Sequence, residues 1–388
     1  MRLGHGVTRL RLMWSLLPLL LLAPALCAAQ GKAASTGNAP AAAAAGAAAP
    51  QSGATGATGA AAATLPLQPA GEIALLLPLK SADFQAAADT LRLGFMTARE
   101  RDGDKISVTI RATDASGENI MLEYDAAVRA GAKVVVGPLT RSGVAALAAS
   151  GRVNVPTLAL NYPEPQANMP EKLYGFGLSI ELEARQVALQ AWIDGIKDVL
   201  AVTAASPLAR RASLAFSESF RALGGVISES LEFTPASELA QLKLIVTNSG
   251  ADGIFLAADV EQARQVRPFL SAALPTYATS LVYSGRNDAL ANVDLNGIRF
   301  VEMPWLVQPD HPAVMSYPRF DSIAPELQRF YALGVDAFRL ASELVRKRSG
   351  ITLDGVTGKL TLLRGTVERE AVAAQFRDGA AIALSPSR

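Results

Sequence analysis

Few side chains in this 388-residue sequence are of the types that carry out catalysis. The two histidines are His5, close to the amino terminus, and His311, between Asp310 and Pro312. A single histidine in the body of the chain cannot form a histidine cluster for a metal, and nothing near it suggests a nucleophile–base pair. The sequence also lacks the GxxxxGK[ST] and GxGxxG phosphate-binding motifs. We therefore expect no catalytic residues, no metal, no cofactor and no enzymatic activity.

Polar residues follow several strand-like segments, where they could line a binding cleft. The backbone N–H groups and the dipole at the start of a helix suit a carboxylate or another anion. These residues therefore predict either a site for a small ligand or, at Ser81 and Thr140, simple helix caps. The candidates are Lys80, Ser81, Thr140, Asn161 and Tyr162, with Ser206 contributed by the second half of the chain.

Trp305 is a separate candidate, because it follows Pro304 directly after a strand-like segment. One interpretation is that it packs in a hinge. The other is that it is exposed and contacts a partner protein, since tryptophan is favoured at the energetic centres of interfaces.

The amino terminus has the pattern of an export signal. Positive charge at Arg2, Arg9 and Arg11 precedes the apolar run Leu12–Leu22, which is too short to span a bilayer stably. Cys27, the only cysteine, follows that run and is our candidate for lipidation. The alternative is ordinary signal cleavage, which would remove Cys27. We assign residues 1–29 to this leader.

Residues 30–70 are rich in alanine, glycine and proline and contain no acidic or aromatic residue. They offer no apolar face to bury, so we expect a disordered tether. A flexible coil of this length spans roughly 35 Å on average. The chain as a whole has a formal net charge of +1 and shows no clustered basic stretch, which argues against nucleic-acid binding.

From residue 71 onwards, strand-like and helix-like segments alternate. Ile73–Leu77 and Val134–Val136 are continuously apolar, as expected for strands buried on both faces of a parallel sheet. Phe84–Arg101 and Asn119–Ala130 have helical length and composition. The alternation predicts an α/β fold, in which ligands tend to bind at the carboxyl ends of the strands.

The same alternation recurs in residues 179–275, which predicts a second parallel lobe joined to the first by a hinge. The domain is expected to cover residues 71–365, followed by a weakly structured tail at 366–388. The expected boundaries are about 71–178 with 276–345 for the first lobe, and about 179–275 with part of the region after 304 for the second. Chain crossings are expected near Gly177, Pro275 and Pro304.

Several segments resemble a known family. Ile73–Lys80 with Gly94, Val134–Leu139, Asn154–Asn161 and the closing segment Leu353–Leu360 resemble type I periplasmic-binding-protein folds. Other segments are similar to the C-terminal domain of the LpoA/LppC family; these are Leu173–Ser179, Glu181–Ala188, Asp252–Arg264 and Phe300–Trp305. The resemblance covers about residues 71–365.

The resemblance implies a two-lobed periplasmic-binding-protein-like clamshell and a non-enzymatic function. Members of the family are outer-membrane lipoproteins that activate a class A, bifunctional penicillin-binding protein in peptidoglycan synthesis. We therefore expect that synthase as the partner and a periplasmic location with an outer-membrane anchor at Cys27. In this fold the corresponding loops hold an amino acid. The alternative function is thus a solute-binding receptor for an amino acid or peptide, serving an ABC-type transporter or a sensor.

Overall fold

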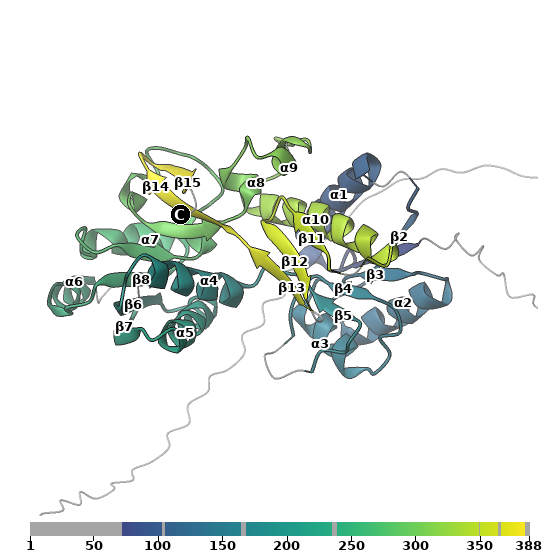
Figure 1. Cartoon of the computed structure of the whole chain (residues 1–388), viewed down its shortest axis with the longest axis horizontal. Coiled ribbons are helices and arrows are strands. Elements are labelled where there is room, and N and C mark those ends of the chain that lie inside the picture. Colours follow the sequence, from purple (N-terminus) through teal and green to yellow (C-terminus); the bar gives the residue numbers. More distant parts are fainter. Residues whose placement is uncertain are drawn as a thin grey trace, which may run out of the picture. The chain divides into compact units, whose positions relative to one another are not determined.

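The chain forms two β-sheets, each with helices on its faces (Figure 1). This arrangement comes from a computed structural model that describes residues 72–102, 105–163, 168–234, 239–348, 350–363 and 366–384. The leader, Cys27 and the tether expected from the sequence lie outside the described residues. Among the described residues, no helix combines the length and the apolarity needed to cross a bilayer.

The first sheet has eight strands in the order β11-β12-β13-β5-β4-β3-β1-β2. The neighbouring parallel strands are β1 (Ile73–Leu77), β2 (Val108–Ala112), β3 (Val134–Val136), β4 (Thr157–Ala159) and β5 (Leu173–Gly175). Antiparallel pairing joins β11 (Thr352–Asp354), β12 (Lys359–Leu363) and β13 (Thr366–Glu370), and β13 joins β5 in parallel.

Helices cover both faces of this sheet, which explains the unbroken apolar runs of β1 and β3. Alternate residues of β1 belong to two different apolar clusters, one on each face. One face carries α1 (Ala82–Asp102) and α10 (Gln328–Val345). The other face carries α2 (Gly117–Arg129) and α3 (Arg141–Ala149). We call this sheet with its four helices the first lobe.

The second sheet has seven strands in the order β15-β14-β10-β9-β8-β6-β7. Its strands are β6 (Asp198–Ala204), β7 (Val226–Phe233), β8 (Gly253–Ala257), β9 (Thr276–Ala278), β10 (Arg299–Glu302), β14 (Val372–Arg377) and β15 (Ala380–Ala383). Its helices are α4 (Ile180–Ile193), α5 (Pro207–Ala222), α6 (Leu239–Asn248) and α7 (Val260–Val266). We call these elements the second lobe.

Short helices fill the connections of the second lobe and of the return to the first. They are α8 (Pro304–Val307), α9 (Pro312–Met315) and the 3-10 helices η1 (Arg267–Phe269), η2 (Ser280–Val282), η3 (Val293–Leu295) and η4 (Pro325–Leu327).

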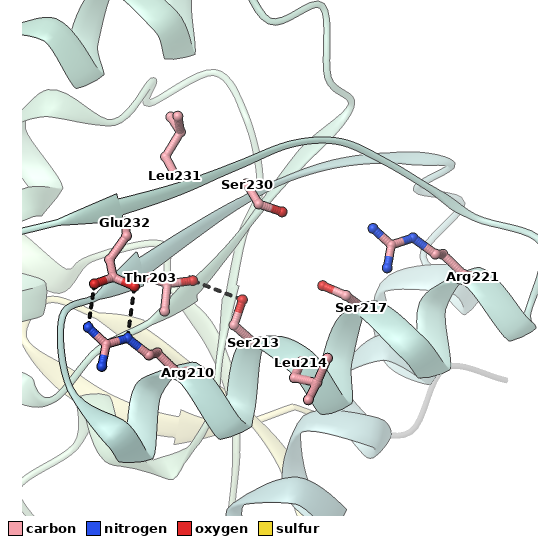
Figure 2. Close-up of a pocket in the computed structure, with 9 residues that line it drawn as sticks. All are labelled: Thr203, Arg210, Ser213, Leu214, Ser217, Arg221, Ser230, Leu231 and Glu232. Atoms are coloured by element: carbon pink, nitrogen blue, oxygen red, sulfur yellow. Dashed lines mark hydrogen bonds and ion pairs between the residues drawn. The ribbon is translucent and has the colours of Figure 1, made fainter. Parts of the chain in front are cut away.

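At one edge of the second sheet, β7 lies beside α5 (Figure 2). The side chains of Arg210 on α5 and Glu232 on β7 form two hydrogen bonds there, at 2.9 and 2.6 Å. On the same face, the Thr203 hydroxyl donates to the Ser213 hydroxyl at 2.8 Å.

The lobe boundaries expected from the sequence need correction. Both β9 and β10 belong to the second sheet, so the segment after residue 275 does not return to the first lobe and Pro275 is not a crossing. Sequence reasoning failed here because β9 is a short strand whose place is set by pairing with β8, which no local pattern reveals.

The expected tail after residue 365 is also wrong. Residues 366–383 form β13, β14 and β15, which complete both sheets. The third crossing lies between β13 and β14, where Ala371 alone separates the two strands. Polar, partly exposed strands such as Thr366–Glu370 carry little apolar periodicity, so they are difficult to predict from residue patterns.

Two glycines allow α1 and α10 to pack with their backbones in contact. A Cβ atom at Gly94 would lie 2.1 Å from the carbonyl oxygen of Tyr331, and one at Gly334 would lie 2.1 Å from that of Leu91. No side chain can occupy either position at the present helix separation.

We predict that Gly94→Ala lowers the free energy of unfolding by about 2 kcal/mol or more, because the helices must separate to admit a methyl group. Chemical denaturation followed by circular dichroism measures the change. Leu93→Ala is the control, since Leu93 is 40% exposed on the same helix and its truncation should cost little. Equal stability of Gly94→Ala and the wild type would contradict the close packing described here.

Candidate functional site

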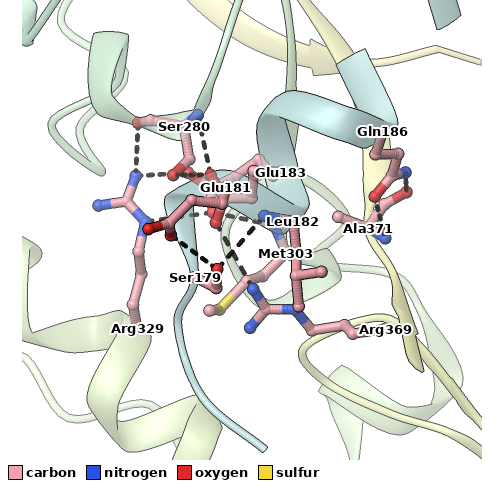
Figure 3. A network of polar contacts seen from close by, with 11 residues as sticks. Ser179, Glu181, Leu182, Glu183, Gln186, Ser280, Met303, Arg329, Arg369 and Ala371 are labelled. Carbon is pink, nitrogen blue, oxygen red and sulfur yellow. Dashed lines mark hydrogen bonds and ion pairs between the residues drawn. The ribbon is translucent and has the colours of Figure 1, made fainter. Parts of the chain in front are cut away.

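A network of charged side chains links the two lobes around the start of α4 (Figure 3). Glu183 of α4 accepts hydrogen bonds from the hydroxyl of Ser280 at 2.7 Å and from its backbone N–H at 3.3 Å. Its second carboxylate oxygen lies 3.5 Å from Nη2 of Arg369, which belongs to β13 of the first lobe. The side chains of Glu183 and Arg369 are 12% and 7% exposed, so this pair is largely removed from water.

A second link joins Arg329 of α10 to Glu302 at the end of β10. The guanidinium donates to both carboxylate oxygens of Glu302 and to the carbonyl oxygens of Ser280, at 3.1 Å, and Tyr283, at 2.9 Å. The backbone N–H of Met303 also donates to Glu302 at 2.9 Å. Glu302 is 1% exposed, and this set of partners compensates the cost of burying its charge.

The third link is made by Glu181, two residues before Glu183. Arg211 of α5 donates to Glu181 Oε1 through Nε at 2.8 Å and Nη2 at 2.5 Å. Arg141, at the start of α3 in the first lobe, has Nη2 at 3.5 Å from the same oxygen. The Ser179 hydroxyl donates to the other oxygen at 2.9 Å. Glu181 therefore contacts cations from both lobes.

The two glutamates differ in their pKa values because their surroundings differ. Burial raises the pKa of Glu183 by more than Arg369 and the Ser280 hydrogen bond lower it. Burial also acts to raise the pKa of Glu181, but hydrogen bonds, chiefly from Arg211, outweigh it, and the pKa lies below its usual value.

Thr140 and Ser206 serve as helix caps. Thr140 is buried and its hydroxyl accepts from the Gly143 N–H at 3.2 Å, while the Ser206 hydroxyl accepts from the Ala209 N–H at 3.2 Å. At Thr140 this agrees with the capping alternative raised from the sequence. Capping uses one acceptor position of each hydroxyl, so a ligand role for either residue stays a prediction.

Lys80 and Ser81 lie between β1 and α1. Lys80 is exposed, and its charge adds to the hydrogen bonds from Ser116 that lower the pKa of Asp114. The backbone carbonyl of Ser81 accepts from the Phe84 N–H at 3.1 Å. Neither side chain takes part in the network described above.

Asn161 and Tyr162 are occupied by contacts within the first lobe. The Asn161 amide donates to the Leu139 carbonyl at 2.9 Å, and its side-chain oxygen accepts from the Tyr162 N–H at 2.9 Å. The Tyr162 hydroxyl donates to the Gly175 carbonyl at 3.3 Å. Burial raises the pKa of Tyr162, in keeping with a packing role.

Trp305 is fully buried, which contradicts the expectation of an exposed partner contact and agrees with hinge packing. Its indole N–H donates to Gln328 Oε1 at 2.8 Å. The Arg319 guanidinium carbon lies 4.4 Å from the ring centroid. The contacts of Trp305 therefore hold in place the segment that follows β10 and leads back to the first lobe.

Sequence reasoning missed the residues that form the network. Glu181 and Glu183 lie in a segment noted for its resemblance to the family but were given no role, and Arg329 and Arg369 were not singled out. Acidic residues in the first turn of a helix are common, so they gave no specific signal. The charged partners are separated in the sequence by between 27 positions, for Arg329 and Glu302, and 186 positions, for Arg369 and Glu183.

The arrangement is suited to holding the lobes together, because each of its three glutamates forms an ion pair with an arginine of the other lobe. Within the described residues, no group of histidine, cysteine, aspartate and glutamate side chains could hold a metal ion. Glu181 and Glu302 accept hydrogen bonds from arginines, and Glu183 forms an ion pair with Arg369, so each glutamate of the network has a cationic partner.

Comparison with known proteins places this chain in a family. A family model described as "LppC putative lipoprotein" matches residues 49–379. The chain belongs to the LppC family. This confirms the resemblance predicted from the sequence.

Curated relatives of this LppC protein are named penicillin-binding protein activator LpoA. The protein from Haemophilus influenzae is 26% identical over 326 residues, covering 81% of this chain and 55% of the relative. The one from Haemophilus ducreyi is 28% identical over 322 residues, covering 79% and 54%. The chain thus spans about half the length of the curated relatives it matches.

Solved structures share the two-lobed fold, as the sequence predicted. The LpoA C-domain from Haemophilus influenzae, described as a regulator of PBP1A, is 27% identical with a TM-score of 0.68, covering 81% of this chain and 99% of that one. A protein from Chromobacterium violaceum, described as a "putative branched-chain amino acid ABC transporter", is 38% identical with a TM-score of 0.68, covering 78% and 99%.

We predict that Arg329→Met destabilises the protein by roughly 3–5 kcal/mol, because it leaves the buried Glu302 carboxylate without its cation. Denaturant unfolding measures the loss. The double variant Arg329→Met with Glu302→Met should recover much of it, since no unpaired charge remains. Arg346→Met, which removes a cation that is 42% exposed, is the control. Additive losses in the double variant would contradict direct coupling.

We also predict that the stabilisation by Glu181 depends on pH. A carboxyl with a lowered pKa in the folded protein stabilises it above the unfolded pKa, near 4.5, and loses this effect as the pH falls through the folded pKa. Glu181→Gln should therefore lower Tm at pH 7 and have a diminishing effect below pH 4.5. Glu232→Gln, which disrupts an exposed pair within the second lobe, is the control. A Tm difference for Glu181→Gln that is independent of pH would show that its charge is not involved.

Proposed function

We propose that this LppC protein is a non-enzymatic regulator that activates a class A penicillin-binding protein in peptidoglycan synthesis. The observation that carries the proposal is the match to the LpoA C-domain, of which the chain covers 99%, and which is described as a regulator of PBP1A. The curated relatives named as activators support the same assignment.

The side chains in the described part of the molecule support action by contact. The charged residues between the lobes are paired with one another, and the described residues include no metal-ligand cluster. The regulator would act by binding one conformation of the synthase more tightly than the others and so increasing its population.

The proposed location is the periplasmic face of the outer membrane, with a lipid on Cys27. The family description as a lipoprotein supports this assignment, as do the export-type leader and the position of Cys27. Residues 30–70 would then let the folded domain reach a synthase at a distance from the anchor.

A solute-binding receptor is the second candidate, and one observation favours it. The protein described as a branched-chain amino acid ABC transporter is 38% identical to this chain, a higher identity than the LpoA relatives reported above. In that case an amino acid or peptide would bind between the lobes, where Lys80, Ser81, Thr140, Asn161, Tyr162 and Ser206 remain the proposed contacts.

We predict that the purified protein increases the glycan-crosslinking rate of a class A penicillin-binding protein from the same cells by about fivefold or more. The measurement is digestion of the product followed by quantification of crosslinked muropeptides. An unrelated protein of similar size is the control for nonspecific effects. An unchanged rate at saturating concentration would argue against the activator function.

A thermal-shift titration with amino acids and muropeptides distinguishes the second candidate. A receptor should show a rise in Tm that saturates with ligand concentration, because the ligand binds only the folded state. We expect no such rise if the protein acts only as a synthase regulator.

A further inference from the structure

The strand β7 forms an unusually accessible edge of the second sheet. It is eight residues long, its inner side pairs with β6, and no strand of the described chain pairs with its outer side. Most of its residues are exposed. A free edge of this kind presents unpaired backbone N–H and C=O groups to another chain.

The backbone geometry identifies the groups that face outward. The carbonyl of Phe233 accepts from the Ala205 N–H at 3.0 Å, so the backbone of Phe233 is directed toward β6. Successive residues of a strand direct their peptide groups to opposite sides. The N–H and C=O groups of Ser230 and Glu232 therefore point away from the sheet and can pair with an added strand.

Two hollows flank the same part of β7, one on each face of the sheet. The hollow on the α5 side has a volume of about 350 Å³ and is lined by the residues drawn in Figure 2, with Ser230 and Glu232 from β7. The hollow on the α6 side has a volume of about 200 Å³ and is lined by Leu231, Glu232 and Phe233 of β7 and by Gln241, Leu242 and Ile245 of α6. A strand added to β7 would direct alternate side chains into these two hollows.

The two hollows differ in chemistry. On the α5 side, Arg221 is exposed, and no hydrogen bond or ion pair holds its guanidinium among the described residues, whereas Arg210 is paired with Glu232 (Figure 2). This side therefore carries an uncompensated positive charge beside the hydroxyls of Ser213 and Ser217. The α6 side combines apolar side chains with the polar side chains of Glu232 and Gln241, and no arginine or lysine lines it.

We propose that β7 binds an extended segment of another protein by strand addition, with an acidic side chain placed toward Arg221 and an apolar side chain placed against α6. The charge complementarity at Arg221 selects the acidic residue. A second copy of this chain fits less well, because Glu229 lies on the same face as Leu231 and would be placed on the side of Leu242 and Ile245, where no cation lines the hollow. This inference goes beyond the proposed function and does not depend on the identity of the synthase.

The test uses a fluorescent eight-residue peptide in which glutamate and valine alternate, with fluorescence anisotropy as the measurement. Two control peptides replace glutamate with lysine or place proline at the centre. We expect binding of the first peptide only. Hydrogen exchange should show protection of the Ser230 and Glu232 amides when it is bound. Binding without this protection, or equal binding of the lysine peptide, would overturn the proposal.

Two variants locate the contact. Ser230→Pro removes an outward N–H group from an edge strand, where proline is tolerated, and should abolish binding, while Ser230→Ala should not. Arg221→Glu should weaken binding about tenfold, through loss of a charge-assisted hydrogen bond. Arg185→Glu, an exposed charge reversal on α4, is its control. If Ser230→Pro lowers the folded fraction, Arg221→Glu and the exchange data decide the outcome.

Sedimentation of the protein without peptide tests whether a second copy of this chain pairs with β7. We expect a monomer. A dimer that is lost in Ser230→Pro and that prevents peptide binding would show that β7 pairs with a second copy, and the proposal would be wrong.

Discussion

Arg329 and Glu302 form a buried ion pair whose two members come from different lobes, and the connection between the lobes depends on it. Glu302 is 1% exposed, so its charge is tolerable only while Arg329 supplies the compensating cation. Two further ion pairs also join a carboxylate of the second lobe to an arginine of the first. They are Glu183 with Arg369 and Glu181 with Arg141. Separating the lobes would remove the oppositely charged partner of several buried side chains at once. The pairs therefore favour one association of the two halves.

Much of the fold could be predicted from the sequence, because strands buried on both faces leave an unbroken apolar run. The segments that became β1 and β3 were identified in this way. The assignment of strands to sheets could not be predicted, since β9 has three residues and gains its place only by pairing with β8. The polar strand β13 was missed for a related reason, because it lacks a periodic apolar face.

The site was less accessible to sequence reasoning than the fold. The cap at Thr140 was correctly indicated, whereas Ser206 was expected only as a ligand contact and also caps a helix. Cap geometry does not distinguish a structural role from ligand binding. Trp305 was correctly placed at the hinge and wrongly considered as an exposed contact, since burial depends on how Arg319 and Gln328 close over it. The fold itself is shared by proteins described as regulators and as transporter components, so it does not choose between them.

The passage from β13 to β14 constrains where the domain can be divided. Ala371 alone separates a strand of the first sheet from a strand of the second. The Gln186 side chain forms hydrogen bonds to the N–H and carbonyl groups of Ala371, at 3.1 and 2.7 Å (Figure 3). The carboxyl-terminal strands therefore connect the two lobes both through the covalent chain and through these hydrogen bonds. A shortened chain ending near residue 365 would lose an inner strand of one sheet and two strands from the border of the other. An isolated domain has to retain the sequence through β15.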